Sequence, residues 1–243
     1  VLGILNKLTL DTFEKLLKKI LEAEIDGQET LEAVIGLIFE KAIDESAFAS
    51  MYAKLCLRLM KEFPLTQPWI SPTGTQQDNA FRTLLLRRCQ MEFEQDAKWT
   101  ADDANSQSER AEIRKNIDSL TAEEKLKIAE EDYERGKLKR RVLGNIRFVG
   151  ELFVQGLISE TIIHRCIRSL LNNIKNPEEE DIESLIGLMI ATGHKIDVSK
   201  SVDIMNSYFE RIKELSVHSG LSNRIKFSLM DLMDLRKAKW ASK

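Results

Sequence analysis

Apolar residues recur along most of this chain at intervals of three and four positions, which is the spacing of one face of an α-helix. The N-terminal stripes contain Phe13, Leu16, Leu17, Ile20 and Leu21; Leu31, Val34, Ile35, Ile38 and Ala42; Phe48, Met51, Leu55, Leu59 and Phe63; and Phe81, Leu84, Leu85, Cys89 and Phe93. The later stripes contain Leu138, Val142, Ile146, Val149, Leu152 and Phe153; Ile162, Ile163, Cys166, Ile167 and Leu170; Leu185, Ile186 and Met189; Val202, Met205, Phe209 and Ile212; and Ile225, Leu229 and Leu232. Such stripes must pack against one another, so the sequence predicts an all-α protein.

Polar residues between the stripes predict where individual helices begin and end. Thr121 and Glu124 have the spacing of a capping box, and Gly156 is placed to cap the end of the helix that follows. Ser222 is placed to begin the last helix. The polar and acidic residues 95–120 lose the periodicity and predict a long flexible loop, with a weak solvated helix as the alternative.

The spacing of the predicted helices indicates a repetitive architecture. About nine or ten helices of roughly 12 to 20 residues are expected, and successive pairs begin about 35 to 45 residues apart, as in two-helix HEAT or armadillo units. Similarity between the pairs is weak, so a compact irregular helical fold is an alternative. The spacing favours an α-solenoid over residues 1–243, and solenoids expose extended binding faces rather than one deep pocket.

Composition narrows the class of protein further. The chain has 243 residues, 43% of them apolar, and a net charge of −3, so it can bury a sizeable core and is no nucleic-acid condenser. Cys56, Cys89 and Cys166 are far apart and form no CxxC motif, which favours a reducing compartment. No apolar run approaches the length of a membrane helix. The chain begins at Val1 rather than Met, which suggests a segment of a longer protein.

Known catalytic and metal-binding patterns are missing from the sequence. His164, His194 and His218 have no second histidine or cysteine three or four positions away, so no metal site is expected. The sequence contains no GxGxxG, Walker or GxSxG motif. A cysteine–histidine nucleophilic pair remains open, because such partners meet only in the fold. The expected protein is not an enzyme and needs no cofactor.

A basic stretch between Arg135 and Arg147 interrupts this nearly neutral chain. One interpretation is a solvated helix surface that pairs with the acidic residues before it. The other is contact with RNA phosphates, without reading of bases, in which a second helix contributes two arginines. The residues of this predicted RNA-binding set are Arg87, Arg88, Lys137, Lys139, Arg140, Arg141 and Arg147.

The last predicted helix carries an aromatic residue on its polar side. Phe227 points about 200° away from Ile225, because successive residues of a helix are about 100° apart. A large exposed aromatic is a candidate anchor for a protein partner. The alternative is that the terminal "RKAKW" tail covers it.

Five blocks of the chain resemble the middle (MIF4G-type) domain of the eukaryotic translation initiation factor 4 gamma family. They are "GILNKLTLDTFEKL" at residues 3–16, "LEAVIGLIFEKAIDESAFASMYAKLCLRL" at 31–59, "FRTLLLRRCQMEFE" at 81–94, "RRVLGNIRFVGELF" at 140–153 and "SNRIKFSLMDLMDLRKAKW" at 222–240. They occur in the family's order over essentially the entire chain, while residues 95–134 do not match well. The resemblance implies a crescent of about five HEAT-type helix pairs.

The resemblance also implies a function. Members of this family act as non-catalytic cytoplasmic scaffolds that clamp the two lobes of the DEAD-box helicase factor 4A and stimulate unwinding of messenger RNA. They also contact RNA, and in animals a neighbouring surface helps recruit initiation factor 3. The helicase is expected to meet two blocks of this chain, around Leu5, Asn6 and Lys7 and around Arg224, Lys226 and Phe227.

A second function is implied by relatives with the same architecture. This domain also occurs in a translational paralogue, in messenger RNA decay and in nuclear cap-binding proteins, where it acts as a regulatory or RNA-binding module. The blocks "ILNKLT" and "IFEKAIDE" favour the initiation factor or its close paralogue.

Overall fold

The computed structural model describes residues 1–9, 11–23, 27–62, 81–96, 120–174 and 176–241, and every regular element within these ranges is helical. The N-terminal elements are α1 (Leu2–Leu5), α2 (Phe13–Leu21), α3 (Gln28–Asp44), the 3-10 turn η1 (Ser46–Phe48), α4 (Ala49–Glu62) and a helix over residues 81–96. The C-terminal elements are α6 (Ala122–Val154), α7 (Glu160–Leu170), α8 (Glu179–Ile196), the 3-10 turn η3 (Ser199–Ser201), α9 (Val202–Ser216) and α10 (Asn223–Lys237). The predicted all-α class is confirmed.

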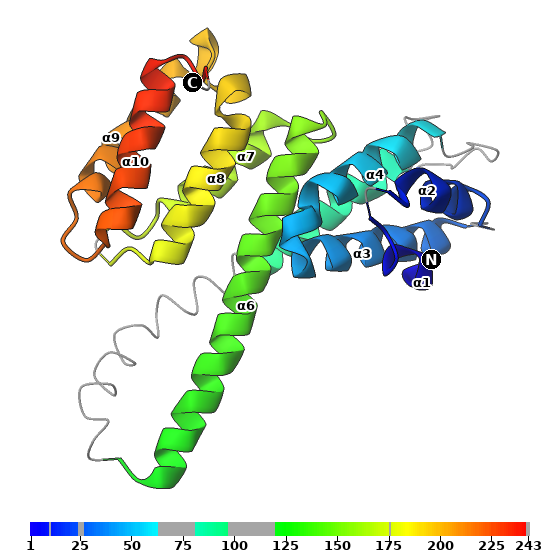
Figure 1. Ribbon diagram of the computed structural model, residues 1–243, viewed down its shortest axis with the longest axis horizontal. Coiled ribbons are helices and arrows are strands. Elements are labelled where there is room, and N and C mark those ends of the chain that lie inside the picture. The colour runs from blue at the N-terminus through cyan, green and yellow to red at the C-terminus, as the bar shows by residue number, and fades with distance from the viewer. Residues whose placement is uncertain (10, 24–26, 63–80, 97–119, 175, 242–243) are drawn as a thin grey trace.

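The helices form a row in which α6 joins the two halves of the molecule (Figure 1). On one side α6 packs against α3 and α4, and on the other it packs against α7 and α8, which α10 and α9 then extend. Contacts between α8 and α10 follow the same order along both helices, from Glu183–Arg224 near their beginnings to Asp197–Arg236 near their ends. These two helices are therefore parallel and pack directly on each other, while α9, which connects them in sequence, packs against α10. The predicted solenoid is confirmed.

One continuous hydrophobic core runs through both halves. Where α3 meets α6, the rings of Phe39 and Phe148 are in an edge-to-face contact with centroids 4.9 Å apart. Most residues of the predicted stripes are buried, but Phe48 is 52% exposed and Leu138 is 43% exposed. Phe48 lies in η1, before α4 begins, so it does not share the buried face of that helix. Phe63 lies outside the described residues.

The helix α6 has 33 residues, more than the roughly 12 to 20 expected of the helices in general, although its two ends lie where the predicted caps place them. It begins at the predicted capping box, in which the Thr121 hydroxyl accepts from the Glu124 amide and the Glu124 carboxylate accepts from the Thr121 amide. It ends at Gly156, whose φ of +75° is in the left-handed region, and the Leu157 amide donates to the Leu152 carbonyl. The first half of α6 projects from the other helices, which explains the exposure of Leu138 (Figure 1). Of the predicted loop 95–120, residues 97–119 lie outside the described part, while 95 and 96 are helical.

Candidate protein-interaction surface

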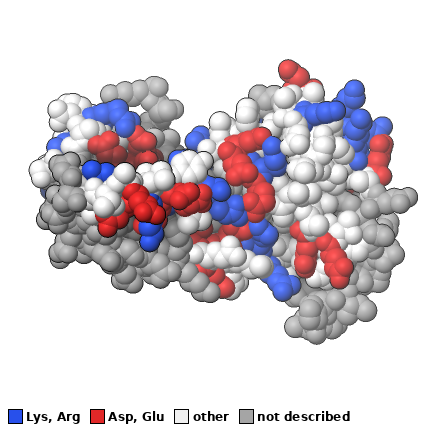
Figure 2. Space-filling model, turned by 90° about the horizontal axis from the view of Figure 1, so that it is seen from below, with Lys and Arg blue, Asp and Glu red and all other residues white. Residues whose placement is uncertain are grey.

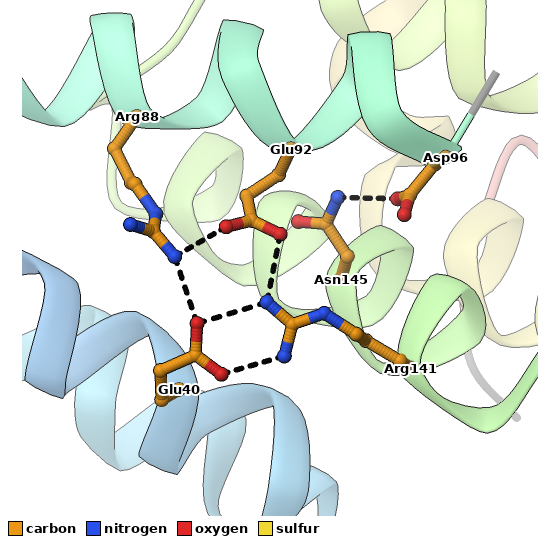
Figure 3. A network of polar contacts seen from close by, with 6 residues as sticks. All are labelled: Glu40, Arg88, Glu92, Asp96, Arg141 and Asn145. Carbon is orange, nitrogen blue, oxygen red and sulfur yellow. Dashed lines mark hydrogen bonds and ion pairs between the residues drawn. The ribbon is translucent and has the colours of Figure 1, made fainter. Parts of the chain in front are cut away.

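Four charged side chains tie three helices together in the N-terminal half (Figure 3). Arg141 of α6 donates to both oxygens of Glu40 on α3, with Nη1–Oε2 and Nη2–Oε1 distances of 2.6 and 2.8 Å. The same guanidinium lies 3.0 Å from Oε2 of Glu92, which is 3% exposed. Arg88 binds the other oxygen of Glu92 and lies 2.7 Å from Glu40. Each carboxylate is thus shared by two arginines, which offsets the cost of removing these charges from water.

The charges of this network are fixed by its geometry. Hydrogen bonding to Arg141, together with the positive charges of Arg141 and Arg88, outweighs burial and holds the pKa of the Glu40 carboxyl below its ordinary value. Hydrogen bonding to Glu40 raises the pKa of Arg141 in turn. Both groups therefore stay ionised at neutral pH. Arg88 and Arg141 were predicted to bind RNA, but the structure uses them to join α3, residues 81–96 and α6.

Lys139 also differs from its predicted role. Its side chain is buried, with the ammonium bonded to Glu178 and 3.3 Å from Asp181 at the beginning of α8. An ammonium held by two carboxylates in a buried site is not available to a phosphate, because releasing it would leave charges unpaired. Lys139 joins α6 to α8.

The remaining cations of the predicted RNA-binding set do not form a uniform basic stripe. Arg87 is exposed 3.7 Å from Glu32, and Lys137 is exposed 3.9 Å from Glu134. Basic and acidic side chains are mixed along the middle of the face drawn in Figure 2.

The other two cations line a groove between α6 and α8. The groove has a volume of about 570 Å³ and contains Arg140 and Arg147, together with the carboxylates of Asp44, Glu151, Glu180 and Glu183. Arginines beside four carboxylates make a mixed surface that suits a protein better than a phosphate backbone.

Phe227, the aromatic residue predicted on the polar side of the last helix, lies on the surface of α10. Phe227 is 63% exposed, while Ile225 and Leu229 on the opposite side of the helix are fully buried. Arg224 is exposed one turn earlier and lies 2.5 Å from Glu183 of α8. The alternative that the tail covers Phe227 is wrong, because Trp240 turns the other way and packs near Phe209, with ring centroids 6.2 Å apart. Lys226 beside Phe227 is half-buried.

The N-terminal block is divided between core and surface. Leu5 was predicted as a partner contact, but its side chain is only 1% exposed and belongs to the core where α1 packs on α2 and α3. Asn6 and Lys7 follow on the surface. The N-terminal block and α10 lie at opposite ends of the row of helices (Figure 1). The structure therefore presents the two predicted contact regions separately, with the core of the molecule between them.

The cysteines and the buried histidine have structural surroundings. Cys56, Cys89 and Cys166 are buried, and burial raises the pKa of the Cys89 thiol to about 12. Burial lowers the pKa of His164, whose Nδ1 lies 3.2 Å from the Tyr208 hydroxyl. These thiols stay protonated at neutral pH, which argues against the cysteine–histidine nucleophile. Within the described ranges, no three His, Cys, Asp or Glu side chains are grouped as metal ligands would be. In the same ranges, no helix has the length and apolar character needed to span a bilayer.

The polar network around Glu92 was missed by sequence reasoning, although the sequence carries a signal for it. Glu92 follows Leu85 by seven residues, so it occupies a core position on an otherwise apolar helical stripe. A carboxylate in such a position has to meet cations from neighbouring helices. Asp96 and Asn145 extend the network, with Asn145 Nδ2 donating to Asp96 Oδ2 at 2.7 Å.

Comparison with known proteins finds relatives among the eukaryotic translation initiation factors of the 4G type. The chain is 40% identical over 241 residues to eukaryotic translation initiation factor 4G of Cucumis melo, and 40% identical over 242 residues to eukaryotic translation initiation factor 4 gamma 1 of Mus musculus. It is 39% identical over 258 residues to eukaryotic translation initiation factor 4 gamma of Schizosaccharomyces pombe. These alignments cover 98%, 99% and 100% of the chain but only 12%, 14% and 17% of those proteins, so the chain corresponds to a small part of each.

A solved structure has the same fold. The crystal structure of the MIF4G domain of Trypanosoma cruzi translation initiation factor EIF4G5 aligns with a TM-score of 0.54 and 21% identity, over 98% of this chain and 94% of that one. The pattern of the MIF4G domain matches residues 1–239. This chain therefore belongs to the MIF4G domain family.

Proposed function

We propose that this chain is a non-catalytic, cytoplasmic scaffold of cap-dependent translation initiation that binds the DEAD-box RNA helicase factor 4A and stimulates its unwinding of messenger RNA. The observation that carries the proposal is the exposed Phe227, which lies in the block "RIKF" that resembles the initiation factor family. An aromatic ring that is 63% exposed stabilises the fold much less than a buried ring does. Contact with a protein partner would account for its presence on the surface.

The arrangement of the two contact regions suggests how such a scaffold works. Asn6 and Lys7 are exposed at one end of the row of helices, and Arg224 and Phe227 at the other. A rigid body that binds one helicase lobe at each end restricts how the lobes move relative to each other. Binding energy spent on this restriction favours the closed, productive arrangement of the helicase, and the scaffold needs no chemistry of its own.

Rigidity between the ends is supported by ion pairs between helices. Glu40, Glu92 and Arg141 join α3, residues 81–96 and α6, and Lys139 joins α6 to the beginning of α8. These contacts cross between helices that are far apart in sequence, so they hold the two halves of the solenoid in one geometry. A flexible joint would let both lobes bind without orienting them.

Contact with messenger RNA is an auxiliary part of the proposal, in a smaller form than the sequence suggested. Arg87 and Lys137 keep exposed side chains near single carboxylates, and such weak surface pairs can exchange for phosphates. Recruitment of initiation factor 3 by a neighbouring surface also belongs to the proposal, on resemblance alone.

The test is the RNA-dependent ATPase activity of purified factor 4A, measured with increasing amounts of this chain. The expected result is saturable stimulation, with no ATP hydrolysis by the chain alone. No effect on the helicase at saturating concentration would contradict the scaffold function. The second function, a decay or nuclear cap-binding module, predicts RNA binding without this stimulation.

A further inference from the structure

The groove between α6 and α8 is lined by none of the residues proposed to contact the helicase. One wall is the face of α6 that carries Arg140, Leu143 and Arg147, and the other is the face of α8 that carries Glu183, Gly187 and Ala191. The end of α3 closes one side of the groove. Its volume of about 570 Å³ lies within the usual range of ligand sites. The groove borders the proposed helicase contact on α10, because Glu183 on its α8 wall lies 2.5 Å from Arg224. Asn6 and Lys7 precede α2 at the other end of the row of helices.

Charge is divided between the two walls. The α6 wall presents Arg140 and Arg147, which are two turns and therefore about 10 Å apart along the helix. Neither arginine makes an ion pair with any residue that the structure describes, although Lys139 and Arg141 beside Arg140 are both paired. The α8 wall presents Glu180 and Glu183, of which Glu180 is 65% exposed. The α6 wall also carries Glu151, one turn after Arg147, so its net charge is positive but smaller than the two arginines alone would give. The α8 wall is negative, although Glu183 shares its charge with Arg224.

Close packing between helices requires some of the glycines that line the groove but not all of them. A β-carbon at Gly144 would lie 2.6 Å from the carbonyl oxygen of Ile43, and one at Gly150 would lie 2.8 Å from the side chain of Leu188. Close packing of helices therefore requires both. A β-carbon at Gly187 would meet nothing within 4 Å.

Gly187 is exposed in the middle of α8, where glycine is less stable than alanine. Internal packing does not explain it. The open space above Gly187 allows the backbone of a bound segment to approach α8 closely.

We propose that this groove binds an α-helical segment of a protein partner other than the helicase. The bound helix carries acidic side chains on the flank that faces Arg140 and Arg147, and basic side chains on the flank that faces Glu180 and Glu183. A stripe of small residues lies against Gly187. This is the helix-in-groove mode of recognition, with orientation set by the opposite charges of the two walls.

RNA fits the groove less well than a zwitterionic helix does. The lining contains the carboxylates of Asp44, Glu151, Glu180 and Glu183 against two arginines. A phosphate backbone has one sign of charge, so it would gain from one wall and be repelled by the other. A helix with different charges on its two flanks matches both walls.

The proposal is tested by selecting binders from a displayed library of helical peptides, with the chain of residues 1–243 as the target. The selected peptides are then measured against Gly187→Trp, which fills the open space with a side chain that points away from the core. The expected result is an at least tenfold loss of affinity for Gly187→Trp, with no loss for Glu210→Trp, a control on the exposed surface of α9. Selected sequences should carry acids and bases on opposite flanks.

Charge reversal identifies the occupant. Peptides selected on the native chain should lose affinity for Arg140→Glu/Arg147→Glu. Exchanging their acidic and basic flanks should restore affinity when Glu180→Lys is added, a change that leaves the Glu183–Arg224 ion pair in place. A selection that yields no peptide sensitive to Gly187→Trp overturns the proposal. The proposal is also overturned if single-stranded RNA binds the native chain and Gly187→Trp weakens that binding, because the groove would then be an RNA site.

Two further measurements distinguish a groove-bound partner from a folding defect and from the helicase itself. The melting temperature of Gly187→Ala should rise, since alanine favours the helix and meets no neighbour, and Gly187→Trp should fold normally. Stimulation of factor 4A by Gly187→Trp should be unchanged. Loss of stimulation would assign the groove to the helicase and contradict the proposal of a separate partner. It would not contradict the scaffold function.

Discussion

The indole ring of Trp240 occupies the space in which Gly193 would otherwise carry a side chain. A β-carbon built at Gly193 would overlap ring atoms Cη2 and Cζ3 of Trp240. The indole Nε1 donates to Oδ2 of Asp197 at 3.0 Å, and Nε of Arg236 donates to the same oxygen at 2.9 Å. Lys239 and Trp240 reach this position with φ values of 54° and 63°, in the left-handed region. The end of α10 is thereby fastened to the end of α8.

Because of this contact, we expect Gly193→Ala to destabilise the protein although alanine is the better helix former. Displacing the indole should lower the free energy of unfolding by about 1–3 kcal/mol, as for other overpacked cores. The measurement is urea denaturation followed by circular dichroism. In a Trp240→Ala background the same change should become neutral or stabilising by up to about 1 kcal/mol. Equal effects in the two backgrounds would show that the indole does not fill this space.

Adjacent arginines on α6 provide a matched test of the buried network. Arg141 binds Glu40 and Glu92, whereas Arg140 lines the groove without an ion pair to any described residue. We expect Arg141→Met to lower the free energy of unfolding by about 1–3 kcal/mol, because it removes a partner of the buried Glu92. Arg140→Met should stay within about 0.5 kcal/mol of the native chain. The same destabilisation for both would contradict the division of roles.

Asp96 gives a prediction about pH. Burial outweighs the hydrogen bond from Asn145 and raises the pKa of the Asp96 carboxyl above its ordinary value of 3.8. A carboxyl whose pKa is raised by folding contributes stability that is fully present below pH 3.8 and is lost as pH rises through the folded pKa. Asp96→Asn removes this loss of stability at higher pH, because an amide does not ionise. The new amide can also donate to Asn145 Oδ1, a buried atom without a hydrogen-bond partner among the described residues.

We therefore expect Asp96→Asn to stabilise the protein at neutral pH, by about 1 kcal/mol. The gain should shrink as pH falls below 3.8, where Asp96 is protonated in both folded and unfolded chains. Denaturant titrations of both proteins between pH 3 and pH 7 would measure this, and an Asp96→Asn variant less stable at neutral pH would contradict it. Asp203→Asn on the exposed surface of α9 is a control that should show no gain.

The helical stripes and caps could be predicted from sequence because they depend on local spacing. Thr121, Gly156 and Ser222 are at helix ends in the structure as the pattern predicts. The angular offset of Phe227 from Ile225 likewise follows from the geometry of one helix. The two caps also predict the extent of α6, whereas its predicted apolar stripe begins only at Leu138, because other helices do not cover the projecting first half.

The roles of the cations could not be read from the chain, because their partners are distant in sequence. Arg140 and Arg141 are neighbours with the same chemistry, yet a rotation of about 100° along α6 sends one into the network and the other into the groove. Glu40 lies 101 positions from Arg141, so its proximity is a property of the fold alone. The groove beside Gly187 depends in the same way on how α6 and α8 pack.

The exposed cations Arg87 and Lys137 allow a test of the proposed RNA contact. Arg87→Glu/Lys137→Glu should weaken binding of single-stranded RNA and reduce the slope of log affinity against log salt concentration, since fewer counterions are released. Each change leaves the buried network intact, so the melting temperature should be nearly unchanged. Fluorescence anisotropy at several salt concentrations measures both affinity and slope. Unchanged values would place any RNA contact elsewhere on the chain.

Phe227 provides the most direct test of the proposed scaffold. Because the ring is 63% exposed, Phe227→Ala should change the free energy of unfolding by less than about 0.5 kcal/mol. Phe209, which is 9% exposed, serves as the buried comparison, and its truncation should cost about 3–5 kcal/mol. An anchor that enters a pocket of the partner contributes about 2 kcal/mol or more, so Phe227→Ala should weaken binding of factor 4A by roughly 30-fold.

A second exposed phenylalanine controls for the general loss of aromatic surface. Phe48 is 52% exposed in η1 and belongs to neither predicted contact region, so Phe48→Ala should leave helicase affinity and stability unchanged. Titration of labelled factor 4A with each variant, beside urea denaturation of the same samples, separates a binding effect from a folding effect. If Phe227→Ala kept full affinity and native stability, α10 would not be a helicase contact. Only the N-terminal residues Asn6 and Lys7 would then remain as the proposed site, and a single contact cannot orient two lobes.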